Sequence, residues 1–165
     1  DMLNDILSRL RKMKHIRTIR ISSRLPVVHP EGMTENHFLA LKRHEPLWIV
    51  IHINHPREVT REFLEHVKRF RNAGSIMISQ TVLLRNVNDC GNILLKLFDM
   101  LVGAGVKPYY LFQLDEVRGA QHFKVKLEKG IQIMRALREK ASGLAIPQYA
   151  VDITGGLGPL IQNQG

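Results

Sequence analysis

The sequence has very little cysteine: Cys90 is the one cysteine in 165 residues. A single thiol cannot form a disulfide within one chain or supply an all-cysteine metal site, so we expect a reducing, cytoplasmic compartment. No run of about 18 apolar residues occurs, and we therefore expect no membrane-spanning segment. The first residues, DMLNDILSRLRKMK, form a charged amphipathic pattern and lack the apolar core of a signal peptide.

Acidic residues are also in the minority, with 15 Asp and Glu against 24 Lys and Arg, for a net charge of +9. A basic surface can attract nucleic acid. The cations, however, are spread over residues 9–14, 68–71 and 135–140, each group towards the end of a helical pattern, where positive charge complements the helix dipole. No aromatic RNA-binding signature accompanies them. We therefore favour solvated helix ends over a nucleic-acid surface.

The remaining composition is that of a globular protein, with 44% hydrophobic residues, 12 Gly and 7 Pro. The length suits a single domain over residues 1–165 with a substantial core. Apolar runs rich in β-branched residues alternate with helical patterns. The predicted strands cover residues 17–22, 47–53, 75–79, 109–113 and 147–151, and the predicted helices cover 2–13, a stretch beginning at Thr34, 58–71, 92–102 and 127–139.

The predicted strands begin about 30 residues apart, which is the length of one βα unit. We therefore expect an α/β fold with parallel strands and outer helices, and the continuous apolar runs predict strands covered on both faces. An eight-unit barrel needs about 250 residues, so a partial (β/α) barrel is expected. The sequence begins without Met inside a helical pattern, and we expect a fragment of a longer protein.

Polar residues follow each predicted strand. In parallel α/β folds, ligands bind at the carboxyl ends of the strands, so these residues predict a ligand site at one rim. The segments are SSRLP at 22–26, HINHP at 52–56, SQT at 79–81, QLDE at 113–116 and DITGG at 152–156.

Several of these residues have two interpretations. His52 and His55 could form a metal pair, but no cysteine or repeated carboxylate lies nearby, so we favour hydrogen-bonding histidines. Arg24 could bind a carboxylate or form a surface ion pair. Asp115 and Asp152 could cap the following helices, or they could bind a cationic group of a substrate.

The glycines at 155–158 also have two interpretations. They could cradle a phosphate, but they match no established glycine-rich motif and are more typical of a turn.

At these rim segments the sequence resembles the lysine 2,3-aminomutase family of radical S-adenosylmethionine enzymes, and the resemblance extends from the first helix to Gly158. It is carried by SRLPVV at 23–28, HINHP at 52–56, QTVLLRNVND at 80–89, KPYY at 107–110, LDEVRGAQHF at 114–123 and VDITGG at 151–156. The resemblance implies an incomplete radical-SAM-type barrel. It also implies three cofactors in the intact parent: a [4Fe–4S] cluster, S-adenosylmethionine and pyridoxal phosphate.

The resemblance also implies roles for four residues. His52 and Gln80 match positions in the S-adenosylmethionine pocket. Asp115 and Asp152 match the aspartate pair that binds the distal ammonium of lysine in the lysine-specific members. The implied substrate is therefore an amino acid with a cationic side chain, lysine before arginine or ornithine, and the implied product is β-lysine.

Two features of the family are absent. The cluster motif CxxxCxxC does not occur, and Cys90 alone cannot supply three thiolates. Pro159 stands where the family has its Schiff-base lysine, and no lysine follows Lys140. This chain therefore offers no catalytic residue, metal ligand or covalent cofactor anchor that we can assign, and we expect the isolated chain to be inactive.

Three origins remain open for such a chain: a portion of an aminomutase, a divergent relative without pyridoxal phosphate anchoring, or a non-catalytic amino-acid- or nucleotide-binding domain. A partial barrel also leaves an open sheet edge, which can pair with another chain. We therefore expect a homo-oligomer.

Overall fold

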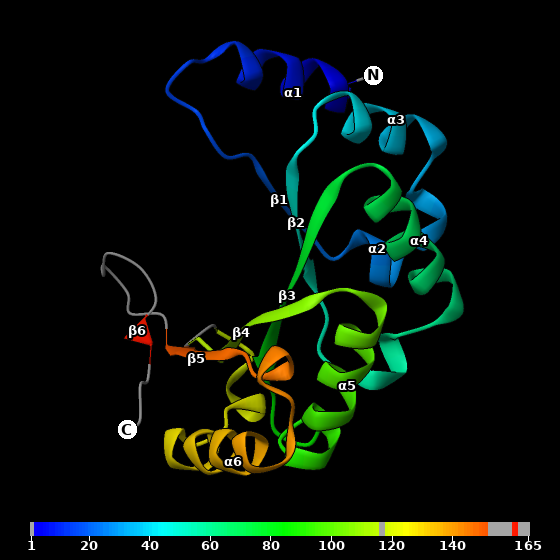
Figure 1. Cartoon of the computed structure of the whole chain (residues 1–165). Helices are drawn as coiled ribbons and strands as arrows, with labels where there is room; N and C mark the ends of the chain where they lie inside the picture. Colours follow the sequence, from blue (N-terminus) through cyan, green and yellow to red (C-terminus); the bar gives the residue numbers. More distant parts are fainter. Residues whose placement is uncertain (1, 116–117, 152–159, 162–165) are drawn as a thin grey trace.

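The computed structural model describes residues 2–115, 118–151 and 160–161 (Figure 1). A six-stranded sheet contains β1 (Arg20–Ser23), β2 (Leu47–His52), β3 (Ser75–Leu83), β4 (Lys107–Gln113), β5 (Gln148–Val151) and β6 (Leu160–Ile161). The helices are α1 (Met2–Lys12), α2 (Leu25–Val28), α3 (Glu35–Arg43), α4 (Arg61–Asn72), α5 (Gly91–Ala104) and α6 (Leu127–Lys140). Short 3₁₀ turns are η1 (Pro30–Gly32), η2 (Pro56–Glu58), η3 (Gln121–Phe123) and η4 (Gly143–Ala145).

Each strand lies beside the next one in the sequence, and β1 to β5 are parallel. When parallel strands follow one another in sequence order and all their crossover connections have the same handedness, the connecting helices lie on one face of the sheet. In a doubly wound sheet the strand order reverses, and helices cover both faces. Figure 1 shows α2, α4 and α5 along the same side of β1–β3. The α/β fold with parallel strands and outer helices is confirmed. In the described residues the sheet ends at β1 and β6, so it is an open, partial barrel.

Helix α4 shows how local sequence produces these elements. The Thr60 hydroxyl accepts a hydrogen bond from the Phe63 N–H (3.2 Å) and so caps the first turn. Phe63, Val67 and Phe70 follow at helical spacing and are at most 3% exposed, because they pack against the sheet. Gly74 ends the segment at φ +72°, a conformation that favours glycine.

The two faces of the sheet differ in their cover. Leu47, Ile49 and Ile51 alternate along β2 and are at most 2% exposed, because they face the helices. Trp48 and Ile76 lie on the opposite face and are 36% and 41% exposed. Val50 and Ile78 on the same face are nevertheless buried (0% and 7% exposed), so among the described residues the prediction of strands covered on both faces is met only in part. We call this second face, which carries Trp48, the open face.

Several elements differ from the sequence prediction: β1 begins at Arg20 and not at Arg17, and α4 begins at Arg61 because Glu58 belongs to η2. Strand β3 continues to Leu83, so Gln80 and Thr81 lie inside the strand instead of following it. It extends because β2 pairs with it as far as Gln80 and β4 pairs with it up to Leu83. Helix α2 and the antiparallel strand β6 were not predicted, because the apolar SRLPVV segment and the glycine-rich end show no periodicity of their own.

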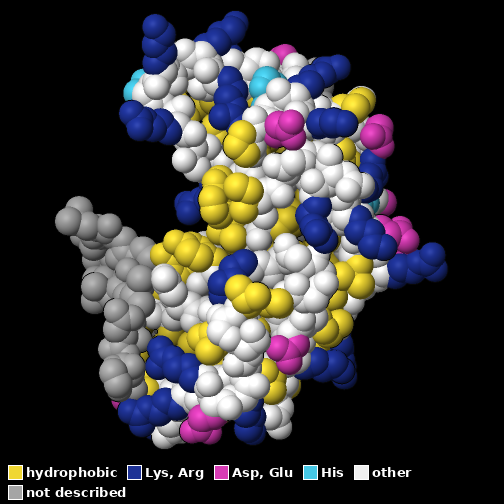
Figure 2. All heavy atoms as spheres, in the orientation of Figure 1, with side chains coloured by type: hydrophobic (Ala, Val, Ile, Leu, Met, Phe, Trp, Pro, Cys, Tyr) yellow, Lys and Arg dark blue, Asp and Glu magenta, His cyan; other side chains and the backbone are white. Residues whose placement is uncertain are grey.

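The basic residues lie where the charge pattern predicted. They occupy the last turns of three helices, and Figure 2 shows Lys and Arg side chains scattered over this side of the molecule instead of forming one patch. The residues are Arg9, Arg11 and Lys12 of α1, Arg69 and Arg71 of α4, and Arg138 and Lys140 of α6. Among the described residues, no helix is both long enough and apolar enough to cross a membrane.

The buried side chain of Tyr149, a residue of β5, leads to a prediction about stability at alkaline pH. Its hydroxyl donates to Gln113 Oε1, and burial together with the charge of Glu128 raises the pKa of Tyr149 to about 12. The neutral phenol therefore contributes stability that is present below pH 10 and is lost as the pH rises through about 12. In urea unfolding at a series of pH values, wild type should lose stability more steeply over this window than Tyr149→Phe. Parallel curves would contradict the buried state of this phenol.

Candidate functional site

Four polar side chains form a row across the open face. His52 of β2 is paired in register with Gln80 of β3, Gln80 with Tyr110 of β4, and Tyr110 with Gln148 of β5. All four alternate with core residues of their strands, so they point away from the helices. His52, Gln80 and Tyr110 are half-buried, and Gln148 is exposed. The row therefore offers an imidazole, two amides and a phenol to one ligand-sized area.

The area above the row, towards the carboxyl ends of the strands, is apolar. Val82, Phe112 and Ala150 are in register there, and the rings of Tyr110 and Phe112 lie 5.0 Å apart between centroids. A hydrogen bond with Tyr109, and burial in addition, raise the pKa of Tyr110, while the charge of Arg20 opposes the shift. The phenol of Tyr110 is therefore neutral at physiological pH and acts as a hydrogen-bonding group.

His52 at the end of the row is held in its neutral form. Burial is the main cause of its lowered pKa, the positive charge of Arg24 adds to it, and hydrogen bonding by Gln80 opposes it. The His52 Nε2 atom is buried and lacks a hydrogen-bond partner of good geometry within the described part of the chain. Buried polar atoms are normally paired, so this nitrogen has unused hydrogen-bonding capacity beside Gln80.

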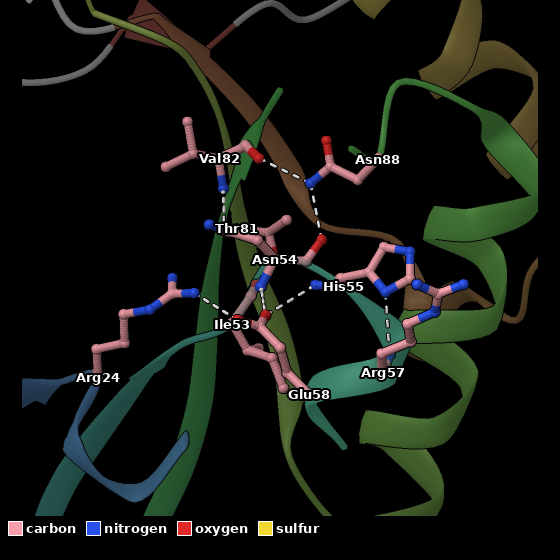
Figure 3. Close-up of polar contacts among 9 residues, drawn as sticks. All are labelled: Arg24, Ile53, Asn54, His55, Arg57, Glu58, Thr81, Val82 and Asn88. Atoms are coloured by element: carbon pink, nitrogen blue, oxygen red, sulfur yellow. Dashed lines mark hydrogen bonds and ion pairs between the residues drawn. The ribbon is translucent and has the colours of Figure 1, made fainter. Parts of the chain in front are cut away.

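The turn after His52 is tied to the loop after β1 by a single carboxylate. Glu58 Oε2 accepts from the N–H groups of Asn54 (2.6 Å) and His55 (3.0 Å), and Glu58 Oε1 accepts from Arg24 Nη2. Figure 3 shows Arg24 and Glu58 pointing toward each other from the two loops. The side chain of Glu58 is 22% exposed, so this ion pair is partly shielded from solvent.

A second set of hydrogen bonds joins the same turn to β3. Asn54 Oδ1 accepts from the Val82 N–H (2.9 Å), and Asn88 Nδ2 donates to the carbonyls of Asn54 and Val82, both at 2.8 Å (Figure 3). The Thr81 hydroxyl donates to the Ile53 carbonyl (2.7 Å). Thr81 is therefore turned towards the helices and is not a rim residue as the sequence suggested, because the strand alternation continues past Gln80.

Of the four predicted site residues, the structure brings two together, places a third near the edge of the sheet and does not describe the fourth. His52 and Gln80 are neighbours in the row. Asp115 is exposed and follows the end of β4 by two residues, at the same carboxyl-terminal edge of the sheet as the rim loops. Asp152 and the glycines at 155–158 lie outside the described residues. The assignment of all four residues to ligands stays a prediction.

The other candidate residues have structural contacts. His55 Nδ1 accepts from the Arg57 N–H (3.1 Å) and caps η2, and Arg24 pairs with Glu58. Cys90 is exposed at the start of α5. In residues 2–115, 118–151 and 160–161, no group of three His, Cys, Asp or Glu side chains is arranged to hold a metal ion.

Sequence reasoning missed Tyr110, Gln148 and Glu58. Tyr110 stands inside the KPYY segment, and its alternation with the core residue Leu111 was the available signal that it faces away from the helices. Gln148 alternates in the same way with Tyr149. Glu58 had no comparable signal, because its partners come from two separate segments of the chain, Arg24 and the turn at residues 54–55.

Comparison with known proteins gives consistent relatives, although no family model matches the chain. It is 41% identical over 160 residues to the L-lysine 2,3-aminomutase of Methanococcus maripaludis and 39% identical over 165 residues to that of Clostridium subterminale. It is 37% identical over 163 residues to the glutamate 2,3-aminomutase of Clostridioides difficile. These matches cover 97%, 99% and 98% of this chain, but only 37%, 40% and 39% of the relatives.

A solved structure has a similar fold. A domain of the pyruvate-formate lyase-activating enzyme from Bacteroides vulgatus aligns with a TM-score of 0.61, over 92% of this chain and 90% of that domain. The two sequences are 14% identical, so the similarity concerns the arrangement of strands and helices alone.

Proposed function

The chain is homologous, over nearly its whole length, to a segment of the lysine 2,3-aminomutases, and from this premise we propose that it is the substrate-side portion of such an enzyme. The proposed reaction is the migration of the α-amino group of L-lysine to C3, which gives β-lysine. The observation that carries the proposal is the 39–41% identity over 160 to 165 residues of this chain.

The polar row suits the cofactor that the resemblance implies. An imidazole, amides and a phenol can hydrogen-bond the nucleoside and amino-acid groups of S-adenosylmethionine, and the apolar Val82 and Phe112 above them would exclude water. S-adenosylmethionine, when bound together with an iron–sulfur cluster, supplies the radical that starts the migration. The proposed roles of His52 and Gln80 are to bind and orient this ligand on the open face.

The proposed substrate follows from charge. Asp115 stands exposed just beyond β4, and Asp152 follows β5 in the sequence. Two carboxylates favour a cationic side chain, because charge-assisted hydrogen bonds from an ammonium group are strong in a water-poor site. The relatives include both lysine and glutamate enzymes, so these two positions are the ones expected to decide between the substrates.

Two of the implied groups do not fit this chain. A [4Fe–4S] cluster needs three thiolates, and the sequence has one cysteine. An imine with pyridoxal phosphate needs the lysine that would follow the glycines at 155–158, and no lysine follows Lys140. A second candidate function, an amino-acid- or nucleotide-binding domain without catalysis, would need neither group.

A chimera tests the proposed substrate. Residues 20–151 would replace the matching segment of the Clostridium subterminale L-lysine 2,3-aminomutase, which retains its own remaining residues. We expect the chimera to convert lysine to β-lysine and to leave glutamate unchanged. Asp115→Lys should lower kcat/KM for lysine about 100-fold, because it replaces an attractive charge with a repulsive one.

The matched control is Asp99→Lys, which makes the same change at an exposed position of α5. It should leave kcat/KM within about twofold of the unmodified chimera, since surface charges away from the site are screened. A chimera whose lysine turnover survives Asp115→Lys would show that this substrate assignment is wrong. A folded chimera with no turnover, together with amino-acid binding by the 165-residue chain, would favour the binding-domain function.

A further inference from the structure

We propose that Arg24 and Glu58 are positioning residues for His52: their ion pair and the backbone hydrogen bonds of Glu58 hold the turn that carries His52 at the end of the polar row. The proposal rests on the function proposed above, because it concerns the same open face. Neither residue belongs to the polar row, so they act through the loops that they join.

The geometry around Glu58 supports this role. Its carboxylate accepts from two adjacent N–H groups, Asn54 and His55, which follow His52, the last residue of β2, by two and three residues. On the far side of the turn, Asn54 is fixed by Val82. The backbone after His52 is therefore held from both sides, and little freedom remains for the ring to leave Gln80.

Arg24 contributes in a second way. It caps the start of α2 with its backbone, and its side chain crosses to Glu58 from 34 residues away. Its positive charge lowers the pKa of His52 in the same sense as burial does. A neutral imidazole has both a donor and an acceptor nitrogen, which an imidazolium does not, so the pair also preserves the hydrogen-bonding capacity of the row.

The test uses the 165-residue chain and needs no ligand for its first two readouts. In an NMR titration, Arg24→Met should raise the pKa of His52, since the repulsive charge is removed. In Glu58→Ala, the amide hydrogens of Asn54 and His55 should exchange about tenfold faster, because they lose their acceptor. A general loss of folding would speed exchange throughout the core, so Leu97 and Leu111 serve as internal references.

The control is Arg57→Met, which removes a cation close in sequence whose side chain is exposed. It should leave the His52 pKa and both exchange rates unchanged. An unaltered His52 pKa in Arg24→Met, or unaltered exchange of Asn54 and His55 in Glu58→Ala, would overturn the proposal.

A third readout separates this proposal from the function it rests on. S-adenosylmethionine titrated into the wild-type chain by calorimetry should bind, and Glu58→Ala should weaken that binding about fivefold or more. If the wild-type chain does not bind, the cofactor role of this face fails, while the pKa and exchange measurements still decide the positioning role. If wild type binds and Glu58→Ala binds equally well, the positioning role fails and the proposed function stands.

Discussion

Gly130→Ala is expected to lower the free energy of unfolding by about 3 kcal/mol, although alanine is normally the better helix residue. Gly130 is buried in α6, and a Cβ atom there would lie 2.0 Å from the hydroxyl and 2.4 Å from Cζ of Tyr149. The ring would have to move, and its hydrogen bond to Gln113 would break. Leaving those buried polar groups unpaired adds to the steric cost. Urea unfolding followed by circular dichroism measures the difference.

The same substitution at Gly103 is the control. Gly103 lies in α5, is exposed, and would place its Cβ atom with nothing within 4 Å. Gly103→Ala should therefore stabilise the chain by about 0.5 kcal/mol through helix propensity. The double variant Gly130→Ala with Tyr149→Leu should lose less free energy of unfolding than the sum of the two single variants, because removing the tyrosine hydroxyl makes room for the new methyl group. Strict additivity would show that Tyr149 is not what opposes the new methyl group.

The order of strands and helices could be predicted from the sequence because it depends on local periodicity. Phe63, Val67 and Phe70 mark α4 by helical spacing, and alternating helices and strands about 30 residues apart imply parallel pairing. These signals need no knowledge of what each element contacts. The same signals predicted His52 near the end of a strand, which the structure confirms.

The polar row could not be predicted in this way, because register depends on pairing between strands. β4 pairs Lys107 with Ile78 and Pro108 with Ser79, and then an irregularity brings Tyr110, not Tyr109, opposite Gln80. Counting from the start of β4 would have placed Tyr109 in the row. The two tyrosine rings lie 4.1 Å apart between centroids, so the irregularity decides which tyrosine is in register with Gln80 and does not send the other to the opposite face.

The contacts that fix the rim loops were equally inaccessible from the sequence. Glu58 looked like the start of a helix, since it precedes the apolar spacing of α4, but it belongs to η2 and accepts hydrogen bonds from the turn before it. An ion pair was one of the two interpretations of Arg24, and the structure shows one, but its partner Glu58 lies 34 residues away in the sequence. Side-chain contacts over such distances follow from the fold and leave no periodic trace.

Asn88→Ala is expected to destabilise the chain by about 3 kcal/mol, the second large effect. Asn88 is fully buried (0% exposed), donates to the carbonyls of Asn54 and Val82, and accepts from the Leu84 N–H at 2.7 Å. Alanine leaves these three backbone groups buried without their partner and leaves a small cavity. Each unpaired buried group costs about 1 kcal/mol or more, so the sum is large for one residue. Equilibrium urea unfolding measures it.

Asn92→Ala is the matched control, because Asn92 is exposed in the first turn of α5 and the substitution removes the same atoms. Its effect should lie within about 0.5 kcal/mol of zero. The two variants should also differ in their effect on the site. Asn88→Ala removes a contact that joins the turn after His52 to β3, so the amide hydrogen of Asn54 should exchange faster in this variant. In Asn92→Ala its exchange rate should be unchanged. Equal stability of the two variants would mean that the hydrogen bonds of Asn88 are replaced by water, and the rim would then be open to solvent at the point where the turn joins β3.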